Sequence, residues 1–179
     1  MQQDNITSLA EQIIAIASQN DIHLSLAESC TGGLVSAALT DVAGASKVFQ
    51  AGYVTYSNEA KMRLLGVSSA TLAQFGAVSA QTAQEMAKGA LWSDHHNHHD
   101  TGRAVAISIT GIAGPSGGTA QKPVGLVYFG IANSQNLLYA EQHIFKNEFT
   151  QKGRNGVRDA SVKKALDLLY MTIKKMVRL

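Results

Sequence analysis

The order of extended apolar runs and helical segments constrains the fold of this chain more than any other feature. Two early runs of β-forming residues, 22–27 and 47–57, are each followed by a helical segment, whereas three later runs, 104–110, 124–132 and 137–145, follow one another through loops. Strands separated by helices tend to pair in parallel, and strands separated by loops pair in antiparallel order. The order therefore predicts an α/β fold with a mixed, partly parallel sheet covered by helices on both faces.

The helical segments carry start and stop signals. Ser57 is in position to cap a short helix that Gly66 ends, and the next helix ends at Gly76. A further helix is expected to start at Ser79. Apolar residues at helical spacing predict two more helices, over about 6–19 and from about 151 to the end of the sequence. The turn "ESCTGG" after the first strand leads into another helix, over about 31–41.

Length and composition are those of one globular domain spanning residues 1–179, because 45% of the residues are hydrophobic and 16% are charged. No apolar run approaches the roughly 20 residues that cross a bilayer, and the first residues lack the basic start of a signal peptide. Cys30 is the single cysteine, so no intramolecular disulfide can form and a reducing compartment fits. We therefore expect a cytoplasmic protein without a membrane partner.

The stretch "LAESCTGGLVSAAL" joins a predicted strand to a predicted helix through small residues. Either Ser29 or Cys30 is a candidate nucleophile. The first N–H groups of a helix lack partners within it, so Thr31, Gly32 and Gly33 are candidate anion-binding residues. The plainer interpretation is that Ser29 or Thr31 caps the helix, as such residues usually do.

Tyr56 ends a predicted strand, and Lys61 lies in the first turn of the helix that follows. The positive end of a helix dipole disfavours a charged lysine there and favours a lower pKa, which suits a general base. Tyr56 is a candidate to relay a proton or to hold the lysine. A solvated lysine and a half-buried tyrosine are the alternative reading of this spacing.

A glycine-rich loop follows the buried run at 104–110, at the place where α/β sheets tend to bind ligands. Its backbone amides are candidates to hold a phosphate or an oxyanion. Arg154 and Arg158 are four residues apart, share a helix face and are candidates to clamp a phosphate, although a solvated face is also typical of such pairs. The candidate binding residues of the loop are Thr110, Gly111, Gly114, Gly117 and Gly118.

The tract "HHNHHD" places His95, His96, His98 and His99 at spacings that would bind a metal if the segment were helical. Histidine-rich tracts are a compositional signal only, so we do not expect a metal site here. We expect no other cofactor either.

Five stretches occur in order along the chain: "AESCTGGL", "GYVTYSNEAKMRLLGV", "GAVSAQTAQEMAKGA", "SITGIAGPSGGTAQKPVGLVY" and "GRNGVRDASVKKAL". Together they resemble the C-terminal domain family of the competence-damage protein CinA. The resemblance implies a three-layer α/β/α sandwich, a homodimer or larger homo-oligomer, and a nicotinamide-nucleotide amidohydrolase. Such an enzyme converts nicotinamide mononucleotide to nicotinate mononucleotide and ammonia in pyridine nucleotide salvage.

Carried over by the same resemblance, the nucleophile falls on Ser29, and the family's lysine and tyrosine fall on Lys61 and Tyr56. Backbone amides at residues 31–33 or 110–118 are then expected to hold the oxyanion. The alternative from another class is a non-catalytic nucleotide-binding module linked to competence or DNA repair. A nucleic-acid partner is not expected, because the net charge is only +2 and the basic residues form no stripe outside the last helix.

Overall fold

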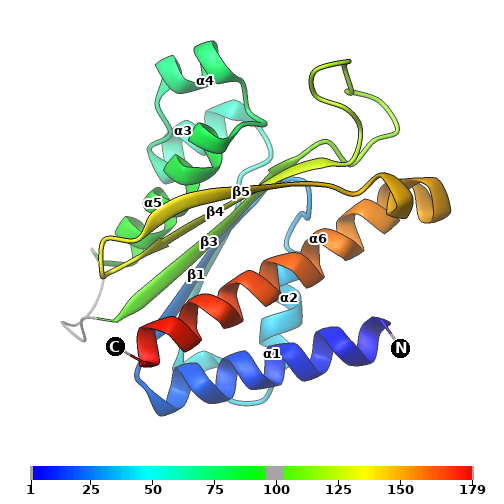
Figure 1. Ribbon diagram of the computed structural model, residues 1–179. Helices are drawn as coiled ribbons and strands as arrows, with labels where there is room; N and C mark the ends of the chain where they lie inside the picture. Colours follow the sequence, from blue (N-terminus) through cyan, green and yellow to red (C-terminus); the bar gives the residue numbers. More distant parts are fainter. Residues whose placement is uncertain (1, 96–102, 179) are drawn as a thin grey trace.

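A five-stranded mixed sheet forms the centre of the protein in a computed structural model that describes residues 2–95 and 103–178. The strand order is β2-β1-β3-β4-β5 (Figure 1). The first three strands in this order are parallel, and β4 and β5 extend the sheet in antiparallel pairing. The mixed sheet predicted from the order of segments is therefore confirmed. The strands are β1 (His23–Glu28), β2 (Phe49–Val54), β3 (Ala104–Gly111), β4 (Leu126–Asn133) and β5 (Leu138–Ile144).

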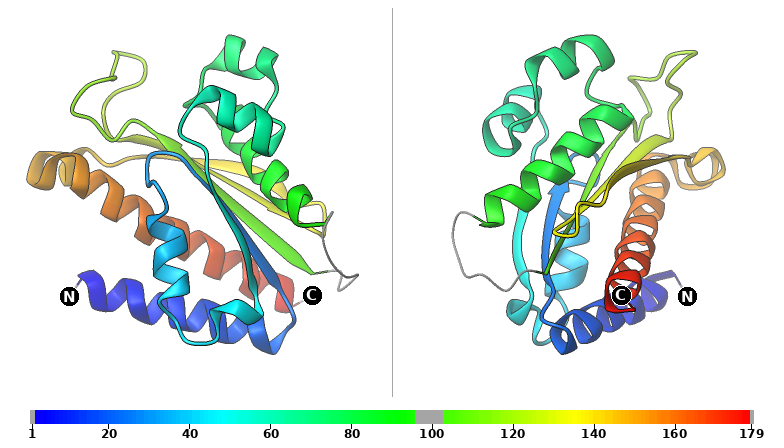
Figure 2. Two further views of the ribbon diagram at one scale, coloured as in Figure 1. Left: turned by 180° about the vertical axis from the view of Figure 1, so that it is seen from behind. Right: turned by 60° about the vertical axis from the view of Figure 1, so that its left-hand side comes forward.

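Helices cover both faces of this sheet, as the views from three directions show (Figures 1 and 2). One face is covered by α5, beside which α3 and α4 lie, and the other by α2 and α6, with α1 packed along α6. The result is the three-layer α/β/α arrangement. The helices are α1 (Gln2–Gln19), α2 (Leu34–Thr40), α3 (Asn58–Leu65), α4 (Ser69–Phe75), α5 (Ala80–His95) and α6 (Lys146–Val177), with a short 3₁₀ turn at Ala45–Lys47.

Two hydrophobic cores lie on the two faces of the sheet, and β3 contributes to both. Its larger side chains, Val105, Ile107 and Ile109, join the core with α1, α2 and α6. Its small residues face α5, so that this helix approaches the sheet closely, and Ser108 Oγ donates a hydrogen bond to the Ala83 carbonyl. The period-two alternation of large and small residues thus fixes which helices pack on which face.

The predicted helix signals agree with the structure at α3 and differ at α2 and α6. Ser57 caps α3 by accepting the Ala60 N–H, and the left-handed Gly66 ends it. Helix α2 starts at Leu34 rather than near residue 31, because positive φ angles at two glycines continue the turn before it. Helix α6 starts at Lys146 rather than near 151 and is interrupted at Gly153, whose φ of 59° and ψ of −145° lie outside the helical region.

One end of the sheet gathers segments that are far apart in the sequence. The carboxyl ends of the parallel strands β1 and β2 point to this end, where the start of α3, the loop after β3 and the first half of α6 also lie (Figure 2). Ligand sites of open α/β sheets form at such ends. No helix in the described part of the chain is long and apolar enough to cross a membrane.

Candidate active site

Ser29 and Lys61 lie side by side at the carboxyl end of β1. Strand β1 ends at Glu28, so Ser29 is the first residue of the turn that follows, and the N–H of Thr55 donates to the Glu28 carbonyl to keep β2 beside β1. Helix α3 then returns Lys61 toward this turn, with its Nζ 3.1 Å from Ser29 Oγ. A hydroxyl within hydrogen-bond reach of an amine is the arrangement of an activated nucleophile.

Lys61 is held in surroundings that disfavour its charge. Its side chain is only 1% exposed, and burial lowers the pKa of the ammonium group below its ordinary value of 10.5, against a smaller opposing effect of Cys30. Nζ donates to the Thr55 carbonyl at 2.7 Å, and no carboxylate forms an ion pair with it among the residues that the structure describes. With Ser29 and Thr55 as its two partners, Nζ suits a neutral amine better than an ammonium group with three protons to satisfy.

Cys30 lies next to Ser29 in the chain but in a different environment. Its side chain is buried, and this burial raises the pKa of the thiol to about 12. The thiolate is the nucleophilic form of cysteine, and it is not populated near neutral pH at such a value. Of the two candidate nucleophiles, the geometry favours Ser29.

Glu28 is a site residue that the sequence analysis did not single out. Its carboxyl group is fully buried and accepts hydrogen bonds from the backbone N–H groups of Gly33, Val35 and Ser36 and from the Ser36 hydroxyl. The N–H groups at the start of α2 are thus occupied within the chain. The predicted contact of Gly33 with a bound anion would have to displace the Glu28 carboxyl group.

Two arginines of α6 reach the same region, as their shared helix face predicts. Arg158 Nη2 donates to the Thr31 carbonyl at 3.0 Å, while its Nε and the Thr31 hydroxyl are buried without a hydrogen-bond partner. Arg154 donates from Nη1 to the Gly114 carbonyl at 2.8 Å and from Nη2 to the Tyr56 hydroxyl at 3.1 Å. Tyr56 is 66% exposed, and the partner of its hydroxyl is Arg154 rather than Lys61.

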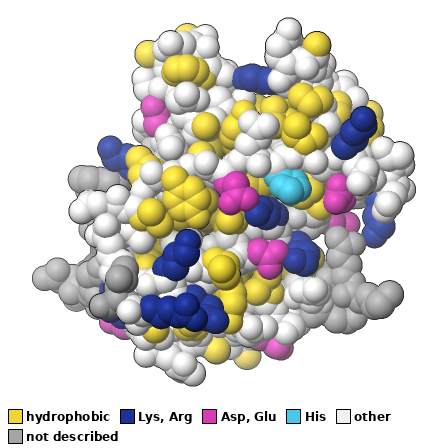
Figure 3. Space-filling model, in the orientation of Figure 1, with side chains coloured by type: hydrophobic (Ala, Val, Ile, Leu, Met, Phe, Trp, Pro, Cys, Tyr) yellow, Lys and Arg dark blue, Asp and Glu magenta, His cyan; other side chains and the backbone are white. Residues whose placement is uncertain are grey.

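The loop between β3 and β4 is fastened to the turn before α5. Lys122 Nζ donates to the carbonyls of Phe75 and Val78 at 2.6 and 2.7 Å, and the Thr110 hydroxyl donates to the Ala77 carbonyl. In the space-filling view, α4 and this loop form two protrusions at the top of the molecule, and the surface between them is depressed (Figure 3). Lys122 thus joins the loop after β3 to the segment between α4 and α5.

The predicted binding glycines of this loop differ in how much space surrounds them. A Cβ on Gly111 or Gly114 would lie 2.7 Å from Val127 or 2.5 Å from Val124, whereas at Gly117 nothing lies closer than 3.8 Å. Gly118 is also crowded by Val124. Gly111 at the end of β3, and Gly114 and Gly118 in the loop after it, therefore have a packing role, and contact with a ligand stays a prediction for all four glycines.

The predicted histidine tract lies mostly outside the described residues, which leave out 96–102, and the side chain of His95 is not described either. In the ranges 2–95 and 103–178, no three His, Cys, Asp or Glu side chains are grouped closely enough to hold a metal ion.

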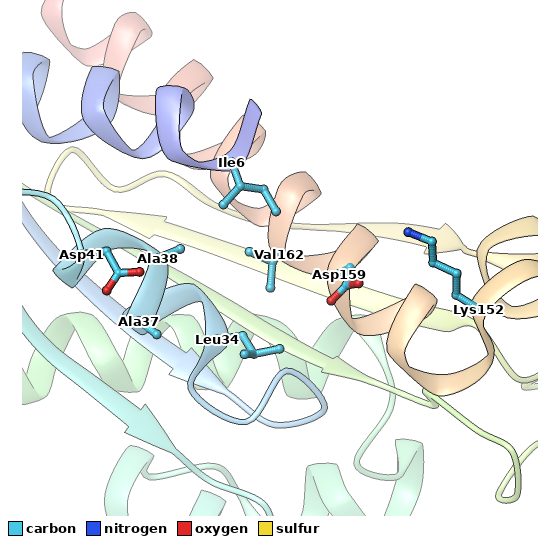
Figure 4. A pocket seen from close by; sticks show the side chains of 8 residues that line it. All are labelled: Ile6, Leu34, Ala37, Ala38, Asp41, Lys152, Asp159 and Val162. Carbon is cyan, nitrogen blue, oxygen red and sulfur yellow. The ribbon is translucent and has the colours of Figure 1, made fainter. Parts of the chain in front are cut away.

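A cavity of about 380 Å³ lies elsewhere, between α1, α2 and α6 (Figure 4). Neither Ser29 nor Lys61 lines it. Its lining is made of Ile6, Leu34, Ala37, Ala38, Asp41, Lys152, Asp159 and Val162.

Comparison with known proteins relates both the chain and its fold to one family. Residues 6–173 match the family described as the CinA C-terminal domain. A nicotinamide-nucleotide amidohydrolase PncC from Enterobacter agglomerans is 45% identical over 148 residues, which cover 83% of this chain and 86% of that protein. A CinA-like protein from Endomicrobium trichonymphae is 45% identical over 93% of this chain and 35% of its own length. The chain spans only 35% to 38% of the length of the first curated relatives that it matches.

Comparison with solved structures relates the chain to proteins of the same family. The crystal structure of the competence/damage inducible protein CihA from Agrobacterium tumefaciens superposes with a TM-score of 0.85 at 42% identity, over 95% of this chain and 96% of that one. A competence-damaged protein (CinA) superfamily protein from Enterobacter cloacae superposes with a TM-score of 0.81 at 31% identity, over 94% of this chain and 92% of that one.

Proposed function

The chain belongs to the CinA C-terminal domain family, and from that premise we propose that it is an amidohydrolase that converts nicotinamide mononucleotide to nicotinate mononucleotide and ammonia. The observation that carries the proposal is the buried Lys61 Nζ, 3.1 Å from the hydroxyl of Ser29. The relative called a nicotinamide-nucleotide amidohydrolase supports the choice of substrate.

In the proposed reaction, neutral Lys61 takes the proton of the Ser29 hydroxyl as Oγ attacks the carboxamide carbon of the substrate. The tetrahedral intermediate collapses when Lys61 returns the proton to the amide nitrogen, which leaves as ammonia and gives an acyl ester on Ser29. A water molecule, deprotonated by Lys61, then attacks the ester carbon. The bond between the ester carbon and Ser29 Oγ breaks as Lys61 returns the proton to Oγ, so nicotinate mononucleotide departs and the serine hydroxyl is restored.

We assign binding of the substrate phosphate to Arg154 and Arg158 of α6. The guanidinium groups of Arg154 and Arg158 lie beside the turn after Ser29 and beside the loop at Gly114, and Arg158 has a buried Nε without a partner. Guanidinium donors pair well with phosphate oxygens. This assignment places the phosphate against Arg154 or Arg158 and leaves the carboxamide for Ser29.

The proposal is tested by ammonia release from nicotinamide mononucleotide in the presence of a chelator. Stoichiometric ammonia and nicotinate mononucleotide support it, whereas no release at micromolar enzyme contradicts it. Tight binding of the nucleotide without turnover would instead support a non-catalytic nucleotide-binding module. Loss of activity with the chelator would point to a metal-dependent hydrolase.

The charge distribution bears on a nucleic-acid partner. The net charge is +2, and over most of the face shown in Figure 3 Lys and Arg side chains are interspersed with Asp and Glu, while one group of basic side chains lies together at its lower left. A nucleic-acid interface gathers basic residues into an extended patch or stripe, so most of this face lacks that signature.

A further inference from the structure

The helix that follows Ser29 is capped by a residue that precedes Ser29. The N-cap position of α2 is Gly33, which has no side chain to accept the first N–H groups of the helix. The Glu28 carboxyl group does this instead: Oε2 accepts from Gly33 and Val35 at 2.9 and 3.2 Å, and Oε1 from the N–H and hydroxyl of Ser36 at 2.8 and 2.7 Å. Both oxygens are therefore fully used as acceptors.

These bonds close a loop around the Ser29 turn, by which we mean residues 29–33. Glu28 is the last residue of β1, and its carboxyl group accepts hydrogen bonds from the start of α2. Gly52 on the neighbouring strand leaves room for the Ser36 hydroxyl, since a Cβ there would lie 2.4 Å from Ser36 Oγ. The two ends of the turn are thus held at a fixed separation by a buried carboxyl group.

Hydrogen bonds to backbone carbonyls and to the Glu28 carboxyl group occupy most of the N–H groups near the nucleophile. Between residues 29 and 37, hydrogen bonds within the chain occupy the N–H groups of Ser29, Gly32, Gly33, Leu34, Val35, Ser36 and Ala37. The N–H of Thr31 has no such partner in this described stretch, and the N–H of Cys30 interacts only with the sulfur of its own side chain. A nucleophile that ends a strand commonly uses the N–H of the next residue for the oxyanion.

Building on the proposed function, we propose that Glu28 is a positioning residue for catalysis. It holds the Ser29 turn so that the Ser29 hydroxyl faces Lys61, and it occupies the helix amides so that Cys30 and Thr31 are left as the oxyanion donors. Glu28 touches neither substrate nor reacting atoms. It acts on kcat through the geometry of the turn, because displacement of reacting groups by about 1 Å costs about 100-fold in rate.

The test replaces Glu28 by glutamine, which keeps the size of the side chain but presents an NH₂ group to backbone N–H donors. The matched control is Glu85→Gln, because Glu85 accepts the Ser68 N–H and the Thr71 hydroxyl at the start of α4, away from Ser29. Glu28→Gln is expected to lower kcat about 100-fold with KM within about threefold. Glu85→Gln is expected to lower the melting temperature while kcat stays unchanged.

Two outcomes overturn the proposal: equal kcat in Glu28→Gln and wild type, or equal losses of kcat in the two glutamine variants. If Glu28→Gln does not fold, Ser36→Ala removes one donor to the carboxyl group, and Thr40→Ala removes a hydroxyl on the same helix that bonds only to helix carbonyls. A kcat loss of about threefold or more in Ser36→Ala alone supports the proposal. Equal kcat in these two variants contradicts it.

A second readout separates this proposal from the proposed function. A fluorophosphonate ester phosphonylates an activated serine by displacement of fluoride and does not depend on the nucleotide substrate. If the wild type releases no ammonia but its Ser29 is labelled, the substrate assignment fails, while slower labelling of Glu28→Gln still supports the positioning role. Equal labelling rates in wild type and Glu28→Gln contradict the positioning role.

Discussion

Lys61 Nζ lies 3.1 Å from Ser29 Oγ although 32 positions separate the two residues in the sequence. On its other side Nζ is fixed by the Thr55 carbonyl at 2.7 Å. The amine therefore points at the hydroxyl without an intervening group. This pair gives the proposed reaction its nucleophile and its base.

Replacement of Ser29 by alanine is expected to lower kcat about 10⁴-fold or more, since removal of a nucleophile disables the reaction that its neighbours support. Cys30→Ala is the matched control, because it removes a single sulfur atom one position away and should retain most of the turnover. Both variants are assayed by ammonia release after circular dichroism shows that they are folded. Activity lost in Cys30→Ala and kept in Ser29→Ala would make the thiol the nucleophile.

The pH dependence of activity should report on Lys61. Burial lowers the pKa of this amine below its ordinary value of 10.5, and the proposed base is the neutral form. kcat/KM is therefore expected to rise with pH and to level off below the pH at which a solvated lysine loses its proton. Lys61→Met should lower kcat/KM by about 10² to 10⁴-fold and remove this dependence. A wild-type profile that still rises at the ordinary lysine pKa would contradict a neutral Lys61.

The same shift predicts how stability changes with pH. The pKa of Lys61 is lower in the folded than in the unfolded chain, so between these two values the unfolded chain binds more protons. The free energy of unfolding contributed by Lys61 must then rise with pH through this window and reach its full value above the unfolded pKa near 10.5. It falls as pH falls through the window and is constant below the folded pKa.

Urea denaturation of wild type and Lys61→Met at a series of pH values measures this effect. The free energy of unfolding of the wild type should increase relative to that of the variant as the pH rises toward the ordinary lysine pKa. A difference between the two proteins that is the same at all pH values would show that Lys61 has an unshifted pKa.

Removal of the Tyr56 hydroxyl distinguishes a proton relay from a positioning contact. The hydroxyl accepts from Arg154, so Tyr56→Phe is expected to cost one hydrogen bond, about threefold to tenfold in kcat/KM. A relay in the reaction would cost about 10² to 10⁴-fold. The control is Tyr128→Phe, in which the lost partner is Gln142 on the neighbouring strand, and which should leave kcat/KM unchanged.

A stability prediction follows from the close packing of α5 on the sheet. A Cβ on Gly130 would lie 2.1 Å from the Ala83 carbonyl oxygen, so Gly130→Ala forces the helix and β4 apart. Overpacking of this kind costs about 1 to 3 kcal/mol. Chemical denaturation should show a lower free energy of unfolding with an unchanged m-value. An unchanged free energy of unfolding would mean that α5 moves without cost.

The sequence was sufficient to predict the mixed sheet, because helices separate the early strands and loops separate the late ones. Ser57 and Gly66 likewise marked both ends of α3, since each acts within one turn of the chain. The separation of Ser29 and Lys61 could not be predicted. It depends on the pairing of β1 with β2, which places Glu28 opposite Val54, and on the angle at which α3 leaves β2.

Two other contacts show which features of the site can be predicted from local sequence patterns and which cannot. The partner of Tyr56 is Arg154, which reaches it from α6 just past the break at Gly153, and no spacing in the sequence encodes that long-range approach. Glu28 could have been identified, because it alternates with Leu24 and Leu26 on one buried face of β1. An acidic residue at such a position needs donors, and the uncapped helix start after Gly33 supplies them.

The residues proposed for catalysis and those proposed for nucleotide binding come from different halves of the chain. Glu28, Ser29 and Lys61 all come from one continuous stretch, β1 to α3, while Gly114, Arg154 and Arg158 come from the loop after β3 and from α6. A recombination point within α5 would therefore exchange the proposed nucleotide contacts as a module and leave the proposed nucleophile and base together. Enzymes of altered substrate preference are best sought by shuffling the C-terminal half among relatives.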